Sequence, residues 1–523
     1  MAQRGAIAAG HAETARAGAT ILEQGGNAFD AALAAVCAAC VAEPVLSSFG
    51  GGGFLLAHPG QGQLRGRTAV YDFFTQTPKR RRAESEVDFF PIVADFGEAT
   101  QEFHIGMGSI AVPGLVKGLF RAHRDLGSMP MADILAPAMD MARRGVPLNR
   151  LHTFIMGVVG PILVSRAASR AVFGHPDDPA RTLDEGGVPA LAILADTFDA
   201  LAHEGEDLFY RGEIGARLAA DCTAGGGHLT RADLEGYTVE PRAPLEVEFN
   251  GARCATNPPP STGGILIAFA LELLRGLDLR RDGFGTAAYL DRLARVMELT
   301  NRARVESRLH EAEAGRAAET LLDPGFLRQY RDGVAGRPFA PRGTTHISVI
   351  DRHGNAAALS VSNGEGCGYL IPGTGIMMNN MLGEEDINPH GFHRWPTDAR
   401  MCSMMSPTLM QERDGTLTVL GSGGSNRIRT AVMQVLLNLA AFGMGAEDAV
   451  AAPRIHFENG VLNVERGVGE GPLRDLAALR DDVTPWDDGN LFFGGVHAAR
   501  LHPRGGAFEG GGDPRRGGVA LVV

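Results

Sequence analysis

The sequence predicts a layered α+β fold, because helix-like and strand-like segments are mixed in both halves of the chain. With 523 residues, 44% of them hydrophobic and 21% charged, the chain can bury a large core. Its 70 glycines fall in short clusters without a fixed period. They therefore indicate tight turns rather than a collagen-like or disordered chain.

Two helices are expected near the start. The first has helical spacing over residues 12–24 and stops at Gly25 and Gly26. Asn27 can cap the second, residues 28–41, which is apolar nearly all round and is therefore expected to be buried. Cys37 and Cys40 lie in it, where small buried side chains are a better interpretation than a redox pair or zinc ligands.

A glycine run at residues 50–53 leads into strand-like residues 54–57, and a second β-rich run follows at 68–73. This pattern predicts a loop that feeds a hairpin. A phosphate-binding loop would need a helix after the glycines and usually a Lys-Ser/Thr pair. A strand follows instead, so nucleotide binding is not expected.

The rest of the chain divides into a mainly helical part, up to residue 341, and a mixed part beyond it. The clearest helical segments of the first part are 132–144, 190–204 and 265–277. In the second part, a turn at 351–355 joins two β-rich runs into a hairpin. The expected elements there are strands 345–350, 356–362, 417–420 and 496–501 and helix 428–442, with 496–501 pairing with 519–523.

Charge and composition argue against several function classes. A formal net charge of -12 argues against a nucleic-acid footprint, and the single basic run, Lys79–Arg82, is expected in a solvated loop. No stretch has the length and apolarity of a membrane span, and the N-terminus lacks the features of a secretory signal, so a cytoplasmic protein is expected. His390 and His393 lack matching carboxylates, so neither a metal nor an organic cofactor is expected.

Several separated motifs resemble the γ-glutamyltransferase family along almost the whole chain. They are GGNAFDAALAA at 25–35, EPVLSSFGGGGF at 43–54, VPGLVKGL at 112–119, NPPPSTGG at 257–264, TTHISVIDRHGN at 344–355, PGTGIMMNN at 372–380, SMMSPTL at 403–409, GSGGSNRIRTAVMQVLLN at 421–438 and AVAAPRIHF at 449–457. Residues 513–516, Asp-Pro-Arg-Arg, also resemble a family motif, and surface or packing duty is their expected role.

The resemblance implies a four-layer αββα sandwich of the N-terminal-nucleophile hydrolases, built from both halves of the chain. It also implies a precursor that is cut between Gly343 and Thr344. The products would be a large, mainly helical subunit, residues 1–343, which contributes strands and the substrate pocket, and a small subunit, residues 344–523. They would remain associated as one folded unit.

Thr344 is a chemically sound nucleophile once it is a chain terminus. Its α-amine, with a pKa near ~8, can then serve as the base for its own hydroxyl. Before the cut, that hydroxyl can attack the carbonyl of Gly343, whose lack of a side chain leaves the attack uncrowded. By resemblance, Ser362 hydrogen-bonds and orients the Thr344 hydroxyl.

The negative charge of the acyl-transfer intermediate needs preorganised donors. By resemblance, these are the backbone N–H groups of Gly424 and Ser425 in the turn GSGGSNR. The family usually has a second glycine at position 425. Because the donor is backbone, serine can supply it if the dihedral angles tolerate a side chain.

The expected substrate contacts depart from the family pattern. Phe74 occupies the place of the arginine that holds the substrate carboxylate, and Met404 replaces the second of two serines, of which Ser403 survives. A shifted clamp, with Arg394 reaching in from a loop, is the alternative. The remaining candidate contacts are Asn363, Asn380 and Glu384, the last in place of an aspartate, while Met381 stands where a polar residue is usual.

Three functions are consistent with the motifs and with the changed substrate contacts. The first is an enzyme that passes a γ-glutamyl or related acyl group from a threonyl ester to water or an amine. The second keeps this chemistry but uses a different acyl substrate, as glutaryl-cephalosporin acylases and capsule-cleaving members do, and Phe74 favours it. The third is a noncatalytic binding protein on a degenerate scaffold, against which the joint presence of Thr344, Ser362 and the glycine turn argues.

Overall fold

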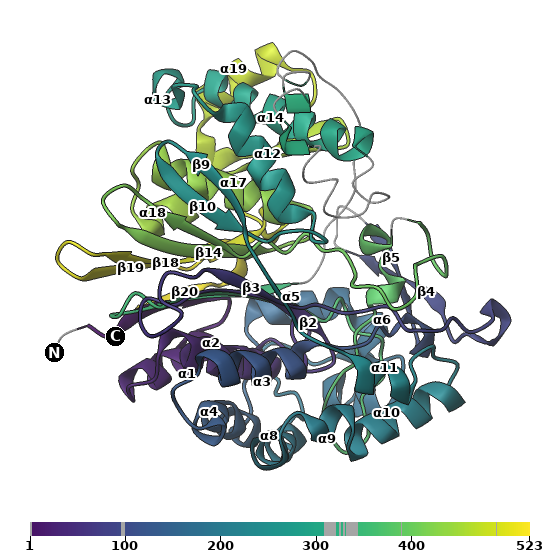
Figure 1. Cartoon of the computed structure of the whole chain (residues 1–523). Coiled ribbons are helices and arrows are strands. Elements are labelled where there is room, and N and C mark those ends of the chain that lie inside the picture. Colours follow the sequence, from purple (N-terminus) through teal and green to yellow (C-terminus); the bar gives the residue numbers. More distant parts are fainter. Residues whose placement is uncertain are drawn as a thin grey trace.

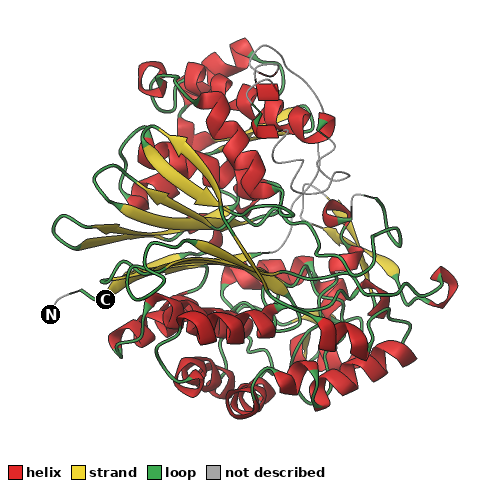
Figure 2. Cartoon of the chain, in the orientation of Figure 1, coloured by secondary structure: helices red, strands yellow, loops and turns green. Residues whose placement is uncertain are grey.

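The computed structural model describes residues 3–95, 100–307, 321–323, 326, 327, 330, 344–388, 390–487 and 489–523. Two β-sheets lie face to face at its centre, and helices cover the outer face of each (Figures 1 and 2). The predicted four-layer αββα sandwich is therefore confirmed. No described helix combines the length and apolarity that a membrane span requires.

The first sheet has seven strands, and all neighbours in it are antiparallel. Side chains alternate between its faces, as the pleat requires: Ile347 and Val349 face the helices, whereas Phe54, Leu56 and Ile350 face the second sheet. The strands, in spatial order, are β20 (Val519–Val522), β1 (Gly5–Ala9), β11 (Thr345–Asp351), β12 (Ala356–Ser362), β2 (Gly52–His58), β3 (Ala69–Phe73) and β8 (Glu240–Arg242).

The second sheet has six strands and is likewise antiparallel. Its central strand β14 ends in the glycine turn that was predicted to hold the oxyanion. The strands, in spatial order, are β19 (Ala507–Gly511), β18 (Gly495–His502), β14 (Leu417–Gly423), β13 (Thr408–Gln411), β10 (Ala252–Thr256) and β9 (Leu245–Phe249).

The helices form two outer layers, each of which packs its apolar side chains against one of the two sheets. The main helices over the seven-stranded sheet are α1 (Ala12–Glu23), α2 (Ala28–Ala42), α3 (Leu115–Leu126), α4 (Met131–Arg144) and α8 (Ile193–Glu204), and those over the six-stranded sheet are α12 (Gly263–Leu274), α14 (Ala287–Glu306) and α17 (Arg427–Ala440). The remaining helices are α5 (Arg150–Val158), α6 (Gly160–Leu163), α7 (Ala167–Phe173), α9 (Asp207–Tyr210), α10 (Glu213–Ala224), α11 (Arg231–Gly236), α13 (Leu279–Asp282), α18 (Ala446–Ala451) and α19 (Glu470–Leu479), and the remaining strands are β4 (Phe90–Asp95), β5 (Thr100–Ile105), β6 (Gly174–His175), β7 (Asp178–Thr182), β15 (Ile455–Glu458), β16 (Val461–Glu465) and β17 (Val483–Trp486).

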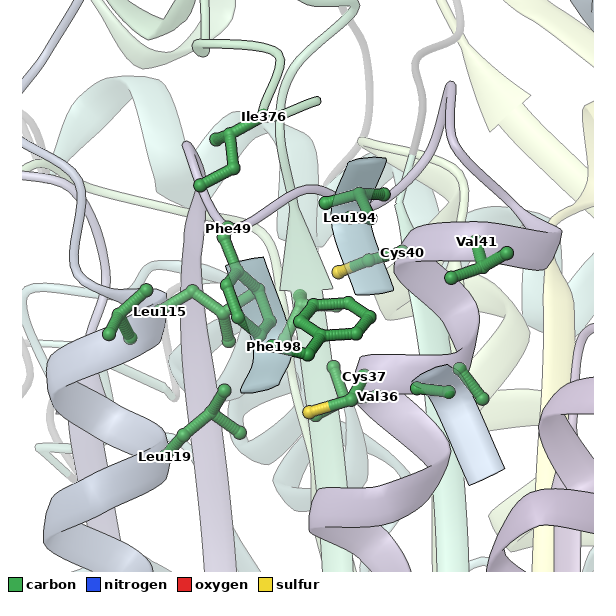
Figure 3. Packing of buried hydrophobic residues seen from close by; sticks show 14 of the residues in the cluster. Val36, Cys37, Cys40, Val41, Phe49, Leu115, Leu119, Leu194, Phe198 and Ile376 are labelled. Atoms are coloured by element: carbon green, nitrogen blue, oxygen red, sulfur yellow. The ribbon is translucent and has the colours of Figure 1, made fainter. Parts of the chain in front are cut away.

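Helix α2 begins and packs as the sequence predicts. Asn27 forms a capping box with Asp30, and every residue of the helix is buried. Figure 3 shows Cys37 and Cys40 among apolar side chains that include Phe49 and Phe198, whose ring centroids are 5.0 Å apart. Both cysteines are free thiols, and burial raises the pKa of Cys40 to about 12, so they are packing residues.

One predicted strand pairing is wrong. Residues 496–501 pair with β14 and β19, whereas β20 pairs with β1 in the other sheet. A turn closed by the hydrogen bond from Gly506 N to His502 O, 3.1 Å long, folds β18 directly onto β19. Strand β1, Gly-Ala-Ile-Ala-Ala, was not predicted because both of its faces are buried and it therefore lacks polar alternation.

Candidate active site

Thr344 and Ser362 lie opposite each other at the open end of the β11–β12 hairpin. The antiparallel register pairs Thr345 with Val361, so one step further places Thr344 across from Ser362. Both side chains line the same cavity, and each residue is 6% exposed. The predicted partner in the cut, Gly343, lies outside the described residues.

Two glycines let the backbone close in on this pair. A Cβ atom at position 423 would lie 2.0 Å from the carbonyl oxygen of Thr344, and one at position 51 would lie 2.3 Å from that of Ser362. Neither position can therefore carry a side chain without displacing the hairpin end. The glycine run at 50–53 thus serves close packing.

The turn after β14 presents two backbone N–H groups near Thr344. Gly424 has φ of 121° and Ser425 has φ of 51°, so Ser425 adopts the left-handed conformation that L-residues rarely take. Within the described part of the chain, the N–H groups of both residues donate no hydrogen bond. They also lie just before the N-terminus of α17, where the helix dipole favours negative charge.

Asp386 holds the side chain of Ser425, a contact that the sequence did not predict. The Ser425 hydroxyl donates to the Asp386 carboxylate over 3.0 Å. This bond stabilises the left-handed conformation on which the direction of the N–H group depends. Asp386 lies 39 residues away along the chain, and its only local signal is the acidic run Glu384-Glu385-Asp386.

Thr345, the residue after Thr344, is anchored from the first half of the chain. Glu43, which follows α2, accepts hydrogen bonds from Thr345 Oγ1 at 2.8 Å and from Thr14 Oγ1 at 2.7 Å. Glu43 is 1% exposed, and burial raises the pKa of its carboxyl group, an effect that the two hydroxyl donors oppose. The start of β11 is therefore tied to α1 and α2.

The cavity next to Thr344 has a volume of about 40 Å³ and a largely apolar wall. The three methionines in it have flexible side chains that can adapt to the shape of a bound group. Four lining residues were missed by the sequence reasoning: Asp386, Ile387, Met405 and Ile428. The full lining is Phe74, Thr344, Ser362, Met381, Glu384, Asp386, Ile387, Ser403, Met404, Met405, Ser425 and Ile428.

Phe74 lines the cavity without offering a charge. Its ring stacks on Phe54 with centroids 5.4 Å apart, and its backbone carbonyl accepts hydrogen bonds from Tyr237 and Arg400. Arg400 is turned away from the cavity, since it also donates to Thr238 O and lies 3.5 Å from Asp72. Arg394, the candidate for a shifted carboxylate clamp, is exposed in its loop and does not line the cavity.

Glu384, Ser403 and Met404 line the cavity as the sequence reasoning proposed. Glu384 is 5% exposed, and the Ser403 hydroxyl accepts a hydrogen bond from Met405 N at 3.0 Å. The Met404 sulfur accepts one from Thr262 Oγ1 at 3.4 Å. The wall of the cavity therefore carries two carboxylates, counting that of Asp386, and among the described residues no Arg, Lys or His.

The two asparagines lie behind this wall rather than in it. Asn380 is fully buried, and its Oδ1 accepts a hydrogen bond from Glu365 N at 2.8 Å. Asn363 is 2% exposed and follows Ser362 in the loop after β12. Asn380 thereby supports the loop that leads away from Ser362. The described residues contain no cluster of His, Cys, Asp and Glu side chains that could hold a metal ion.

The chain matches known proteins over nearly its whole length. The model of the gamma-glutamyltranspeptidase family matches residues 14–523. The glutathione hydrolase proenzyme of Escherichia coli is 30% identical, over 92% of this chain and 86% of the relative, and the acylase ACY 1 proenzyme of a Pseudomonas species is 30% identical over 96% and 90%.

A solved structure shows the same fold. The crystal structure of a cephalosporin acylase from Bacillus halodurans superimposes with a TM-score of 0.80, at 23% identity, over 99% of this chain and 96% of that one. The family match and the two relatives above extend through both halves of the chain, including the Thr344 hairpin and the glycine turn. The chain thus belongs to the gamma-glutamyltranspeptidase family and is an enzyme of the N-terminal-nucleophile hydrolase type.

Proposed function

We propose that the chain is a proenzyme that cuts itself between Gly343 and Thr344 and then transfers a γ-glutamyl or related acyl group to water or an amine. The observation that carries this proposal is the meeting of Thr344, Ser362 and Ser425 on one cavity wall. The proenzyme names of the relatives support the cut.

The transfer uses groups of this chain alone. The Thr344 hydroxyl attacks the substrate amide carbon, and its proton passes to the α-amine of the same residue. Ser362 orients the hydroxyl, and the N–H groups of Gly424 and Ser425 stabilise the negative oxygen. The amide C–N bond then breaks, the leaving amine takes the proton, and the acyl group stays on Thr344 as an ester. Water or a second amine attacks this ester and frees the threonine.

The sheet architecture supports the proposal that both fragments remain one unit after the cut. Strands β11 and β12 come from residues 344–523, yet they lie between β1 and β2, which come from residues 1–343. Their ladders are formed along whole strands on both sides. Separating the fragments would break these ladders and expose both cores.

Denaturing electrophoresis with N-terminal sequencing tests the cut. Purified wild-type protein is expected to give fragments of residues 1–343 and 344–523, with the smaller one beginning at Thr344. Thr344→Ala removes the attacking hydroxyl and is expected to stay a single chain. Fully active wild-type protein that remains uncut would contradict the mechanism.

A second candidate function, amide acylase activity on an acyl group other than γ-glutamyl, is favoured by the cavity wall. The free carboxylate of a γ-glutamyl group would meet Phe74, Met404 and two carboxylates, without a cation among the described lining residues. A charge-assisted hydrogen bond to a carboxylate is worth about 1.5–3 kcal/mol, so its absence weakens binding more than tenfold. We therefore expect a preference for acyl groups that are less zwitterionic.

The comparison that tests this preference uses anilides that differ only in the acyl group. We expect kcat/KM for plain acyl-anilides, which carry no free carboxylate, to equal or exceed that for γ-glutamyl-anilide. An advantage of the γ-glutamyl substrate above about tenfold, roughly 1.4 kcal/mol in transition-state stabilisation, would rule out the second candidate. Neither result bears on the proposed cut between residues 343 and 344, because that reaction does not involve the anilide.

A further inference from the structure

Arg516 contacts the nucleophile from the C-terminal segment of the chain. It ends a short turn (Pro514–Arg516) and is 7% exposed, and its Nη1 lies 3.3 Å from the carbonyl oxygen of Thr344, to which it donates. This is a contact of a buried cation with the backbone of the proposed catalytic residue. From the sequence, only a surface or packing role was predicted for residues 513–516.

The Arg516 side chain fills space that three glycines leave open. A Cβ atom at position 423 would lie 3.0 Å from Arg516 Nη1, one at 424 would lie 3.4 Å from Nη2, and one at 495 would lie 2.2 Å from Cδ. Arg516 therefore packs on the end of β14 and on the turn that carries the proposed oxyanion donors. It contacts the nucleophile and the oxyanion turn at once.

The turn that presents Arg516 is fixed by Asp513. Asp513 is fully buried, and its Oδ2 accepts a hydrogen bond from Val496 N at 2.8 Å and lies 2.7 Å from Arg454 Nη2. Its backbone carbonyl accepts from Arg516 N at 3.1 Å. The neighbouring Arg515 points elsewhere, since it pairs with Glu465 over 2.6 Å. The two consecutive arginines thus have different partners.

Carboxylates around Arg516 offset the cost of burying it. Burial lowers the pKa of the Arg516 guanidinium, whereas Asp513, Glu365 and Glu43 raise it. Glu43 is also the group that holds the Thr345 hydroxyl. Thr344 and Thr345, at the entry and start of β11, are therefore held by neighbouring charged groups: Arg516 binds the Thr344 carbonyl, and Glu43 binds the Thr345 side chain.

We propose that Arg516 is a positioning residue that holds Thr344 in place both for the cut after residue 343 and at the chain terminus that the cut creates; this rests on the proposed function. A new chain terminus frays unless it is tied down. A displacement of about 1 Å can cost about a hundredfold in rate. By fixing the carbonyl, Arg516 keeps the α-amine and hydroxyl of Thr344 facing Ser362 and the turn at 424–425.

Steady-state kinetics of Arg516→Gln and Arg516→Lys test this role. With the anilide that the wild type turns over, we expect Arg516→Gln to lower kcat by about ten- to a hundredfold while KM changes less than threefold. Arg516→Lys keeps a donor and the charge and is expected to recover part of kcat. The matched control is Arg500→Gln, a buried arginine of β18 that pairs with Glu412 and should affect stability only.

The outcomes separate this proposal from the proposed function. A wild type that is uncut or inactive refutes the proposed function itself. If the wild type is cut and active, kcat within twofold of wild type for both Arg516 variants overturns the positioning role, as does an equal loss of kcat in Arg500→Gln. A folded Arg516→Gln protein that stays uncut supports it, because the cut needs the same placement of Thr344. If Arg516→Gln does not fold, Arg516→Lys decides: reduced kcat at unchanged KM supports the role, and unchanged kcat overturns it.

Discussion

At the scale of single residues, the site depends on hydroxyl groups that are held in place by hydrogen bonds. Ser362 Oγ accepts a hydrogen bond from Gly364 N at 3.0 Å, which fixes its orientation at the end of β12. The Ser425 hydroxyl is held by Asp386 in the same way. Both serines are buried in the cavity wall, so their positions are set before any substrate arrives.

Ser362→Ala is expected to slow both the cut and the turnover by about tenfold to a thousandfold, the range for positioning and proton-transfer effects. The change removes one oxygen atom and little volume, so the fold should remain intact. The measurements are the rate of fragment formation, kcat, and the melting temperature. Wild-type rates in this variant would show that Ser362 does not orient Thr344.

At the scale of elements, strand register brings the site together. The β11–β12 hairpin sets Thr344 opposite Ser362, and a shift of one residue would turn every side chain of β11 to the other face. The end of β14 comes from the second sheet and presses Gly423 against the Thr344 carbonyl. Thr344, the proposed nucleophile, is thus located where the two sheets meet.

Gly423→Ala tests this contact between the sheets. The added methyl group would lie 2.0 Å from the Thr344 oxygen, so we expect Thr344 to be displaced, with at least a hundredfold loss of cutting and turnover. Overpacking of this kind should also cost about 1–3 kcal/mol of stability. Gly157→Ala is the control, because a Cβ atom there meets nothing within 4 Å. Normal activity of Gly423→Ala would contradict the proposed geometry.

At the scale of the whole molecule, the sequence predicted what depends on local signals. The capping box of Asn27 and Asp30, the apolar α2 and the turn of the β11–β12 hairpin are all encoded within a few residues. The family motifs supplied the four layers and the pairing of Thr344 with Ser362. These predictions needed no knowledge of which distant segments meet.

The remaining features arise from contacts between distant segments. Hydrophobic alternation does not specify a partner strand. The predicted pairing of β20 with β18 is therefore wrong, and β20 pairs with β1. The contact of Asp386 with Ser425 and that of Arg516 with Thr344 span 39 and 172 residues. No periodicity within either segment marks such a contact. Both contacts became visible only when the two sheets and their loops were placed together.

The most direct test of the central claim is the mass of the small fragment during turnover. Enzyme that is quenched with acid while it hydrolyses an anilide should carry the acyl group as an ester on Thr344, seen as one added acyl mass in residues 344–523. Peptide mapping should locate that mass at the N-terminal threonine, and Thr344→Ala should show none. An acyl group on any other residue, or product release without acylation of Thr344, would contradict the account.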